Sequence, residues 1–196
     1  MKITILTIFP DMCEQVLSCS ILGRARGAGL LEARAVDIRA YSASKHKNTD
    51  DYPFGGGQGM LMTAQPIADA MKAVCPPDFQ GLRIYMGPKG RRLDQKLVTE
   101  LARQRELVLL CGHYEGVDQR VLDHYIDCEV SIGDYILTGG ELAALVLTDT
   151  VARLIPGVLG SAFSAVDESF SASGLLEYPQ YTRPRVFEGA AVPDIL

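Results

Sequence analysis

The stretch Leu107-Val108-Leu109-Leu110-Cys111 is apolar at every position, and Gly112-His113-Tyr114-Glu115-Gly116 follows it directly. A strand that is hydrophobic throughout is typical of a parallel sheet, because helices cover both of its faces. A glycine-containing loop immediately after such a strand lies at the carboxyl edge of the sheet, where ligands of α/β proteins bind. The stretch therefore predicts an α/β domain with a ligand site at this edge.

Segments suited to strands and to helices alternate on both sides of this stretch. We predict strands at 2–9, 30–38, 82–86, 106–111 and 126–132, and helices at 11–28, 64–74, 93–104, 117–124 and 140–154. This alternation favours an α/β fold with a mostly parallel sheet flanked by helices. Two polar segments interrupt it: residues 40–59, too long for a simple connection, and residues 160–174, which have the composition of a linker.

The composition of the 196 residues is that of an ordinary globular protein, with 47% hydrophobic and 22% charged residues. It excludes collagen-like and wholly disordered chains. No apolar run reaches the ~18 residues of a membrane span, and Pro10-Asp11 ends the apolar start of the chain without a signal-peptide cleavage site. The five cysteines contain no C-x-x-C pair, which argues against a disulfide framework and a zinc site. We expect a cytoplasmic protein that binds no metal and no membrane.

Charge is distributed unevenly along the chain. Residues 1–105 carry 15 Lys and Arg against 10 Asp and Glu, whereas residues 106–196 carry 4 against 14. A basic half suits an anionic partner such as nucleic acid, and a solvated surface explains the same counts.

Three glycine-containing loops each follow a predicted strand. They are Tyr85-Met86-Gly87-Pro88-Lys89-Gly90, Cys111 to Gly116, and Ser131-Ile132-Gly133-Asp134-Tyr135-Ile136-Leu137-Thr138-Gly139-Gly140. The carboxyl ends of parallel strands meet at one edge, so these loops are expected to form a cleft lined by backbone donors and acceptors.

A fourth glycine cluster, Gly55-Gly56-Gly57-Gln58-Gly59, lies in the polar segment. No strand precedes it, which argues against a dinucleotide-binding oxidoreductase. Its glycines either bring backbone amides close to a flat or anionic ligand or form a flexible loop tip.

Two further positions allow a functional and a structural interpretation. Arg153 follows a long apolar helix, where it either complements the helix C-terminus or grips a carboxylate or phosphate. Asp167-Glu168 in the linker either keep it soluble or supply a general base on a segment that closes over a cleft.

Several stretches together resemble one family, the bacterial tRNA (guanine-N1-)-methyltransferases, a branch of the SPOUT methyltransferases. In chain order they are Ile8-Phe9-Pro10, Asp50-Asp51-Tyr52-Pro53-Phe54-Gly55-Gly56-Gly57-Gln58-Gly59-Met60, 110–118, 131–141, Arg153-Leu154-Ile155-Pro156-Gly157-Val158-Leu159-Gly160 and Tyr181-Thr182-Arg183-Pro184. They extend across nearly the whole chain.

The resemblance implies a SPOUT-type fold whose C-terminal half forms a trefoil knot, and a homodimer with active sites at the subunit interface. It implies methylation of the guanine base immediately 3′ of the tRNA anticodon, position 37, with S-adenosylmethionine as the methyl donor. The implied cofactor contacts fall in the three strand-end loops: Tyr85, Met86, Pro88, Gly112, Tyr114, Glu115, Ser131, Ile132, Gly133, Asp134, Tyr135, Ile136, Leu137, Gly139 and Gly140. The Gly55–Gly59 loop is implied to receive the guanine, with Gly59 in contact and His46 and Asp50 nearby.

For catalysis, the resemblance implies a carboxylate base from the linker and the arginine that ends the helix, which correspond to Glu168 and Arg153. Relatives carry Asp before Ser-Phe, so Asp167 stays an alternative to Glu168. The implied organisation is a cofactor-binding catalytic domain over 1–160, an interdomain linker over 161–175 and the start of a C-terminal region over 176–196. Relatives continue from there into a small helical domain that helps to bind tRNA, whereas this sequence stops at Leu196.

Two rival functions fit parts of the sequence. The chain could bind cofactor and tRNA without turnover, or it could be a SPOUT enzyme for another RNA or base. The Gly-Gly-Gly-Gln-Gly-Met loop and the Asp-Glu-Ser-Phe segment favour the guanine-N1 branch.

Overall fold

The computed structural model describes residues 1–160 and 178–195. The strands are β1 (Lys2–Thr7), β2 (Glu32–Asp37), β3 (Asp50–Asp51), β4 (Leu61–Met62), β5 (Leu82–Arg92), β6 (Glu106–Cys111), β7 (Cys128–Ser131), β8 (Val186–Phe187) and β9 (Ala190–Ala191). The helices are α1 (Pro10–Leu17), α2 (Ser20–Gly27), the 3-10 helix η1 (Ile38–Tyr41), α3 (Ala64–Val74), α4 (Gln95–Ala102), α5 (Gln119–Tyr125) and α6 (Glu141–Ala152).

Five strands form one sheet in the order β2-β1-β6-β5-β7, and every neighbouring pair is parallel. The apolar strand β6 lies at the centre, where Leu109 pairs with Ile5 of β1 on one side and with Ile84 of β5 on the other. The predicted α/β fold with a mostly parallel sheet is therefore confirmed.

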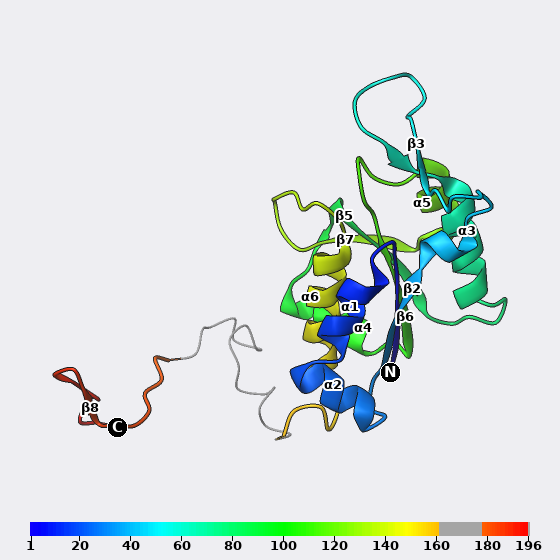
Figure 1. Ribbon diagram of the computed structural model, residues 1–196. Coiled ribbons are helices and arrows are strands. Elements are labelled where there is room, and N and C mark those ends of the chain that lie inside the picture. The colour runs from blue at the N-terminus through cyan, green and yellow to red at the C-terminus, as the bar shows by residue number, and fades with distance from the viewer. Residues whose placement is uncertain (161–177, 196) are drawn as a thin grey trace.

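Helices cover both faces of this sheet (Figure 1). Helices α1, α2, α4 and α6 pack on one face, and α3, α5 and η1 pack on the other. The side chains of β6 alternate between the two layers: Leu107 and Leu109 enter the first core, and Val108 and Leu110 enter the second. This alternation explains why the strand is apolar at every position.

The predicted helix at 11–28 forms two helices, α1 and α2, joined by a sharp turn. Ser20 has a positive φ of 49° there. Gly23 makes the turn possible, because an ideal Cβ on it would lie 2.2 Å from the carbonyl oxygen of Ser18. Buried residues lie on both sides of the turn at close to helical spacing, so the sequence pattern does not reveal the break.

Strand β5 continues beyond its predicted end at residue 86. After Met86 it forms a bulge and pairs again with β7 through Arg91 and Arg92. Gly90 allows this close return to the sheet, because an ideal Cβ on it would lie 2.3 Å from the carbonyl carbon of Glu129. Glycine and proline are typical of turns, which is why the sequence predicted a loop over the whole of 87–90.

Residues 178–195 contain a small antiparallel hairpin, in which Val186 of β8 pairs with Ala191 of β9. The peptide bond before Pro184 is cis, and almost all of these side chains are exposed. Within the described residues, no helix combines the length and the hydrophobicity that a membrane crossing requires.

Burial of the central strands predicts how much stability is lost when one of their side chains is truncated. Ile5 of β1 is fully buried, so Ile5→Ala should lower the free energy of unfolding by about 2–5 kcal/mol through the cavity it leaves. Ile195 is 93% exposed, so Ile195→Ala removes the same atoms and should change stability by less than about 0.5 kcal/mol. Denaturant titrations at one protein concentration measure both values, and equal effects would contradict the assignment of the core.

Candidate functional site

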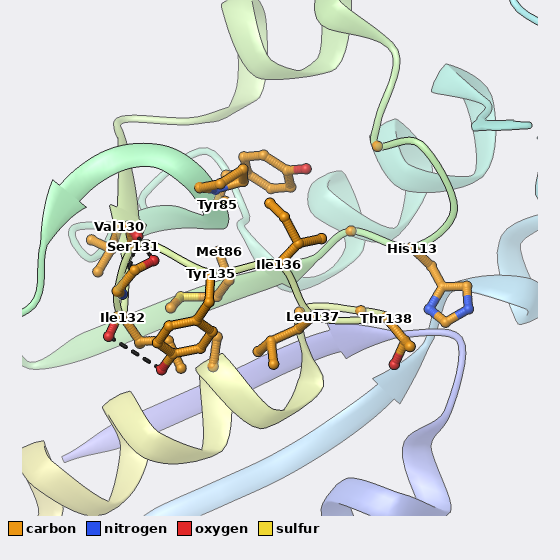
Figure 2. Close-up of a pocket in the computed structure, with 18 of the residues that line it drawn as sticks. Tyr85, Met86, His113, Val130, Ser131, Ile132, Tyr135, Ile136, Leu137 and Thr138 are labelled. Atoms are coloured by element: carbon orange, nitrogen blue, oxygen red, sulfur yellow. Dashed lines mark hydrogen bonds between the residues drawn. The ribbon is translucent and has the colours of Figure 1, made fainter. Parts of the chain in front are cut away.

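A pocket of about 380 Å³ lies at the carboxyl edge of the sheet, where all three predicted loops meet (Figure 2). The loops come from the ends of neighbouring strands, so residues far apart in sequence share one cavity. The predicted cofactor-binding residues that line it are Tyr85, Met86, Pro88, Gly112, Tyr114, Glu115, Ser131, Ile132, Gly133, Tyr135, Ile136, Leu137, Gly139 and Gly140. Most of the residues that line this pocket are therefore among those that the family resemblance implied as cofactor contacts.

Asp134 is the exception among the predicted cofactor-binding residues. Its exposed carboxylate accepts a hydrogen bond from Arg92 at 2.5 Å, and it does not line the pocket. The loop around it curls, because the hydroxyl of Tyr135 donates to the carbonyl of Ile132 at 3.4 Å. Gly133 has a φ of +154° and lies under the Tyr135 ring, where an ideal Cβ would be 2.4 Å from a ring carbon.

Gly140 fixes the end of this loop to the central strand. Its N–H donates to the carbonyl of Gly112 at 2.8 Å. An ideal Cβ on Gly140 would lie 2.8 Å from the Cα of Cys111, so only glycine permits the approach. Helix α6 starts at the next residue, and its first turn is thereby placed against the pocket.

Two tyrosines line the pocket, and they differ in exposure. Burial, followed by the charge of Glu129, raises the pKa of Tyr85, which is only 8% exposed. Burial and then the charge of Asp50 raise the pKa of Tyr114, which stands at the rim. Both side chains therefore remain phenols at neutral pH and can donate a hydrogen bond.

The thiols near the pocket are poor nucleophiles. Burial is the largest cause that raises the pKa of Cys13 to about 12 and the pKa of Cys111 well above its ordinary value. A thiol attacks as the thiolate, so these two buried cysteines serve as packing residues.

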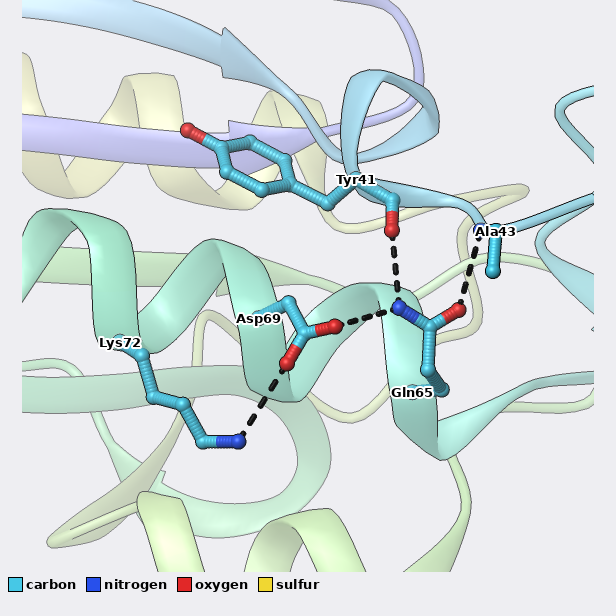
Figure 3. A network of polar contacts seen from close by, with 5 residues as sticks. All are labelled: Tyr41, Ala43, Gln65, Asp69 and Lys72. Carbon is cyan, nitrogen blue, oxygen red and sulfur yellow. Dashed lines mark hydrogen bonds and ion pairs between the residues drawn. The ribbon is translucent and has the colours of Figure 1, made fainter.

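The polar segment 40–59 is anchored at its start by Gln65 of α3 (Figure 3). The side-chain amide of Gln65 donates to the carbonyl of Tyr41 at 2.9 Å and accepts from the N–H of Ala43 at 3.2 Å. Asp69 accepts from the same amide and from Lys72, and these two hydrogen bonds lower its pKa.

The backbone that directly follows the glycine cluster is joined to the pocket rim by hydrogen bonds. The N–H of Glu115 donates to the carbonyl of Met60 at 3.0 Å, and the N–H of Met62 donates to the carbonyl of Gly116 at 2.9 Å. Gly59 lies against Glu115, since an ideal Cβ on it would be 2.4 Å from the Cγ of that side chain. The glycine cluster and the pocket rim therefore form one connected surface.

The predicted guanine-binding residues are placed differently. Gly59 touches a pocket residue, and Asp50 accepts a hydrogen bond from the hydroxyl of Tyr114 at 3.5 Å. His46 lies on an exposed turn, where its N–H donates to the Oγ of Ser44. The structure thus brings Asp50 and Gly59 to the rim, whereas the backbone of His46 makes a local contact with Ser44.

Arg153 lies at the far end of α6 from the pocket. It is the C-terminal cap of the helix, and its N–H donates to the carbonyl of Asp149 at 3.1 Å. A helix rises by 1.5 Å per residue, so the 12 residues of α6 separate Arg153 from Gly140 by about 18 Å. Asp167 and Glu168 lie outside the described residues.

Other pocket residues carry no distinctive sequence signal. Gly87, His113, Gly116, Val130, Thr138 and Ala143 complete the lining. Most belong to the predicted loops, so their position within those loops is the one signal that could have selected them. The sequence also did not single out the aromatic side chains of Tyr52 and Phe54, which are 78% and 102% exposed beside the glycine cluster.

Comparisons with known proteins agree on one family. The sequence profile described as "tRNA (Guanine-1)-methyltransferase TrmD" matches residues 1–196. The tRNA (guanine-N(1)-)-methyltransferase of Ruminiclostridium cellulolyticum is 54% identical to this chain over 197 residues, which cover 100% of the chain and 84% of the relative. The protein of that name from Clostridium botulinum is 53% identical and is covered over 80% of its length.

A solved structure also matches the fold. The crystal structure of tRNA (m1G37) methyltransferase from Aquifex aeolicus superposes with a TM-score of 0.83 and 35% sequence identity, covering 99% of this chain and 81% of that one. The family profile and the relatives cover the whole chain, and the solved structure covers 99% of it. The chain therefore belongs to the tRNA (guanine-1)-methyltransferase family, whose members take the methyl group from S-adenosylmethionine.

Proposed function

We propose that the strand-end pocket binds S-adenosylmethionine and that the protein uses it to methylate N1 of guanosine 37, immediately 3′ of the anticodon of tRNA. The observation that carries this proposal is the attachment of the glycine cluster to the pocket rim: Met60 and Met62, directly after the cluster, make backbone hydrogen bonds with Glu115 and Gly116, and Gly59 lies against Glu115. These contacts place a surface suited to a flat base beside a cavity suited to a small cofactor. Methyl transfer requires the two ligands side by side, at near-attack distance.

The pocket suits the cofactor in size and in the nature of its walls. Its volume of about 380 Å³ falls within the roughly 300–1,000 Å³ of small-molecule sites. Met86, Ile132 and Leu137 supply apolar surface, and the glycine-rich loops expose backbone groups for hydrogen bonds. When bound, S-adenosylmethionine supplies a methyl group already activated by its sulfonium. The protein's remaining tasks are alignment and removal of the guanine N1 proton.

We assign removal of the N1 proton to Glu168, with Asp167 as the alternative. Arg153 is assigned to hold that carboxylate oriented and ionised, because an adjacent cation favours the charged form of an acid. The planar guanidinium suits this task, since it can donate two parallel hydrogen bonds to one carboxylate. At the pocket rim, Gly59, Asp50 and His46 are assigned to the guanine and its neighbours.

We propose a homodimer in which Arg153 of one subunit serves the pocket of the other. About 18 Å of helix separates Arg153 from Gly140 within one chain, too far for one side chain to span. A partner subunit could bring its own Arg153 to the rim, which would make each active site composite.

The apolar surface of α1 and α6 supports this dimer. Met12 and Val16 of α1 and Leu142 and Val146 of α6 are each 40% to 50% exposed, and Phe9 beside them is 41% exposed. The two helices pack against each other, so these side chains belong to neighbouring elements. Large exposed apolar patches on a soluble protein mark interaction sites. The first turn of α6 also borders the pocket, which makes this surface continuous with the proposed active site.

We further propose the organisation that the family implies. Residues 1–160 form the catalytic domain, 161–175 an interdomain linker and 176–196 the start of a C-terminal region. The knot would be completed between β7 and α6. In support, the chain leaves the edge strand β7, passes the end of β6 at Gly112 and enters a helix that packs on α1 and α4. A cytoplasmic location fits an enzyme that modifies tRNA.

The close approach of Gly140 predicts a matched pair of glycine variants. Gly140→Ala should weaken binding of S-adenosylmethionine and lower the free energy of unfolding by about 1–3 kcal/mol, because its Cβ meets backbone that must shift. Gly27→Ala should leave binding unchanged, since a Cβ on Gly27 meets nothing within 4 Å and Gly27 is helical. Calorimetry and denaturant titration measure both effects. Normal cofactor binding by Gly140→Ala would place the cofactor elsewhere.

The base assignment predicts a large loss of turnover in Glu168→Gln. This variant keeps the size of the side chain but cannot accept the proton, so single-turnover methylation should fall by about 10²–10⁴-fold with little change in cofactor affinity. Asp167→Asn is the matched control and should be mild. A collapse in Asp167→Asn instead would move the role to Asp167.

The assay behind this prediction also tests the function itself. It follows methyl incorporation into tRNA that carries guanine at position 37 and into the same tRNA with another base there. Equal methylation of both tRNAs would indicate a different target base. Cofactor binding without any turnover would indicate a binding protein.

The composite site predicts complementation between two inactive variants. Arg153→Ala removes the arginine, and Gly112→Ala disturbs the pocket because its Cβ would lie 2.6 Å from the hydroxyl oxygen of Tyr85. In mixed dimers, one site is assembled from the two intact halves, so remixing the variants should restore activity to about a quarter of the wild-type level. Activity that stays at the level of the separate variants would show that each chain uses its own Arg153.

A further inference from the structure

Glu141 is a buried carboxylate that the proposed reaction does not use. It begins α6 directly after Gly140 and is only 4% exposed. Its Oε1 accepts a hydrogen bond from the hydroxyl of Thr7 at 2.7 Å, and the same hydroxyl accepts from the N–H of Phe9 at 2.8 Å. None of the ion pairs between residues of 1–160 involves Glu141. Burying an unpaired charge is costly, so its retention calls for a second partner.

The side chain of His113 lies close to Glu141, on the other side of Gly139. The ring packs edge-on between Phe9 and Tyr114, at centroid distances of 5.1 and 4.9 Å. Its Nδ1 is buried and has no hydrogen-bond partner in the part of the chain that the structure describes. His113 is nevertheless one of the residues that line the pocket.

Gly139 lies between the Nδ1 of His113 and the second carboxylate oxygen of Glu141. An ideal Cβ on Gly139 would lie 2.3 Å from the Oε2 of Glu141 and 2.6 Å from the Nδ1 of His113. A donor nitrogen and a charged acceptor oxygen thus flank one position that only glycine leaves empty. Gly139 and His113 are also paired as an isolated antiparallel bridge, which ties both backbones together at this point.

The charge of Glu141 also affects two buried thiols. After burial, it is the largest cause that raises the pKa of Cys13 and of Cys111. Both cysteines belong to the core beneath the pocket. The groups near the carboxylate include the hydroxyl of Thr7, two thiols and the imidazole of His113, whose Nδ1 has no hydrogen-bond partner among the described residues.

We propose that Glu141 is a positioning residue for the cofactor pocket: Thr7 holds its Oε1, and its Oε2 accepts a hydrogen bond from the Nδ1–H of His113 when the cofactor is bound. A small turn of the imidazole satisfies both groups. The bond fixes the His113 ring and the Gly139–Gly140 turn, two walls of the cavity, to the end of β1. The inference rests on the proposed cofactor site, because it concerns the shape of that site.

The test compares Glu141→Ala and Glu141→Gln in the full chain. Glu141→Ala removes both hydrogen bonds and should raise the dissociation constant for S-adenosylmethionine by about tenfold or more, since small misplacements at a reaction site are costly. Glu141→Gln keeps the volume and a neutral acceptor, so its loss should be smaller. Asp78→Asn, in the exposed connection between α3 and β5, removes the same charge and should behave as the wild type.

A spectroscopic measurement separates positioning from general loss of structure. Nitrogen NMR of the imidazole rings should show His113 Nδ1 protonated and hydrogen-bonded in the wild-type protein with S-adenosylmethionine. The chain contains three histidines, and His46→Gln and His124→Gln identify the signals of the other two. The His113 signal should shift in Glu141→Gln and stay unchanged in Asp78→Asn.

The outcomes distinguish this inference from the proposed function. Failure of the wild-type chain to bind S-adenosylmethionine would overturn the proposed cofactor site. Wild-type binding, together with a folded Glu141→Ala that binds equally well, would overturn the role of Glu141. An unprotonated His113 Nδ1 in the wild-type complex would overturn it as well, and this measurement does not depend on whether a Glu141 variant folds.

Discussion

The site depends on one close approach, that of Gly140 to the end of the central strand. The N–H of Gly140 binds the carbonyl of Gly112, and its Cα lies against the backbone of Cys111. This contact fixes where the loop from β7 ends and where α6 begins, so it sets the frame within which the loop between Ser131 and Glu141 folds. A side chain at residue 140 would separate the loop from the strand and open the pocket.

The sequence predicted the parts of this arrangement that depend on local chemistry. The apolar run of β6 indicated a sheet covered on both faces, and the glycines after three strands indicated the cleft that the structure contains. The first strand and α3 likewise follow from apolar patterns within one segment.

Features that depend on contacts between distant segments were not predictable. The return of β5 to the sheet after residue 87 requires the backbone of β7, so Gly87 and Pro88 alone suggest a loop. The turn between α1 and α2 is local, but the buried residues on its two sides keep close to helical spacing, so the pattern does not reveal the break. The family resemblance implied a cofactor contact for Asp134, whereas in the structure its carboxylate accepts a hydrogen bond from Arg92. The link between Glu141 and Thr7 joins residues 134 positions apart, which no sequence pattern reveals.

The backbone hydrogen bonds between Met60 and Glu115 and between Met62 and Gly116 have a thermodynamic consequence. They join the segment assigned to the target base to the loop assigned to the cofactor, so ordering one of them restricts the motion of the other. The free-energy cost of that ordering therefore falls on the binding of the first ligand, and the second ligand binds to a segment that is already ordered. Linkage then requires reciprocity: if the cofactor tightens the hold on tRNA, tRNA tightens the hold on the cofactor by the same factor. The demethylated cofactor lacks the positive charge of the sulfonium and need not share this coupling. A weaker coupling after methyl transfer would favour dissociation of the two products.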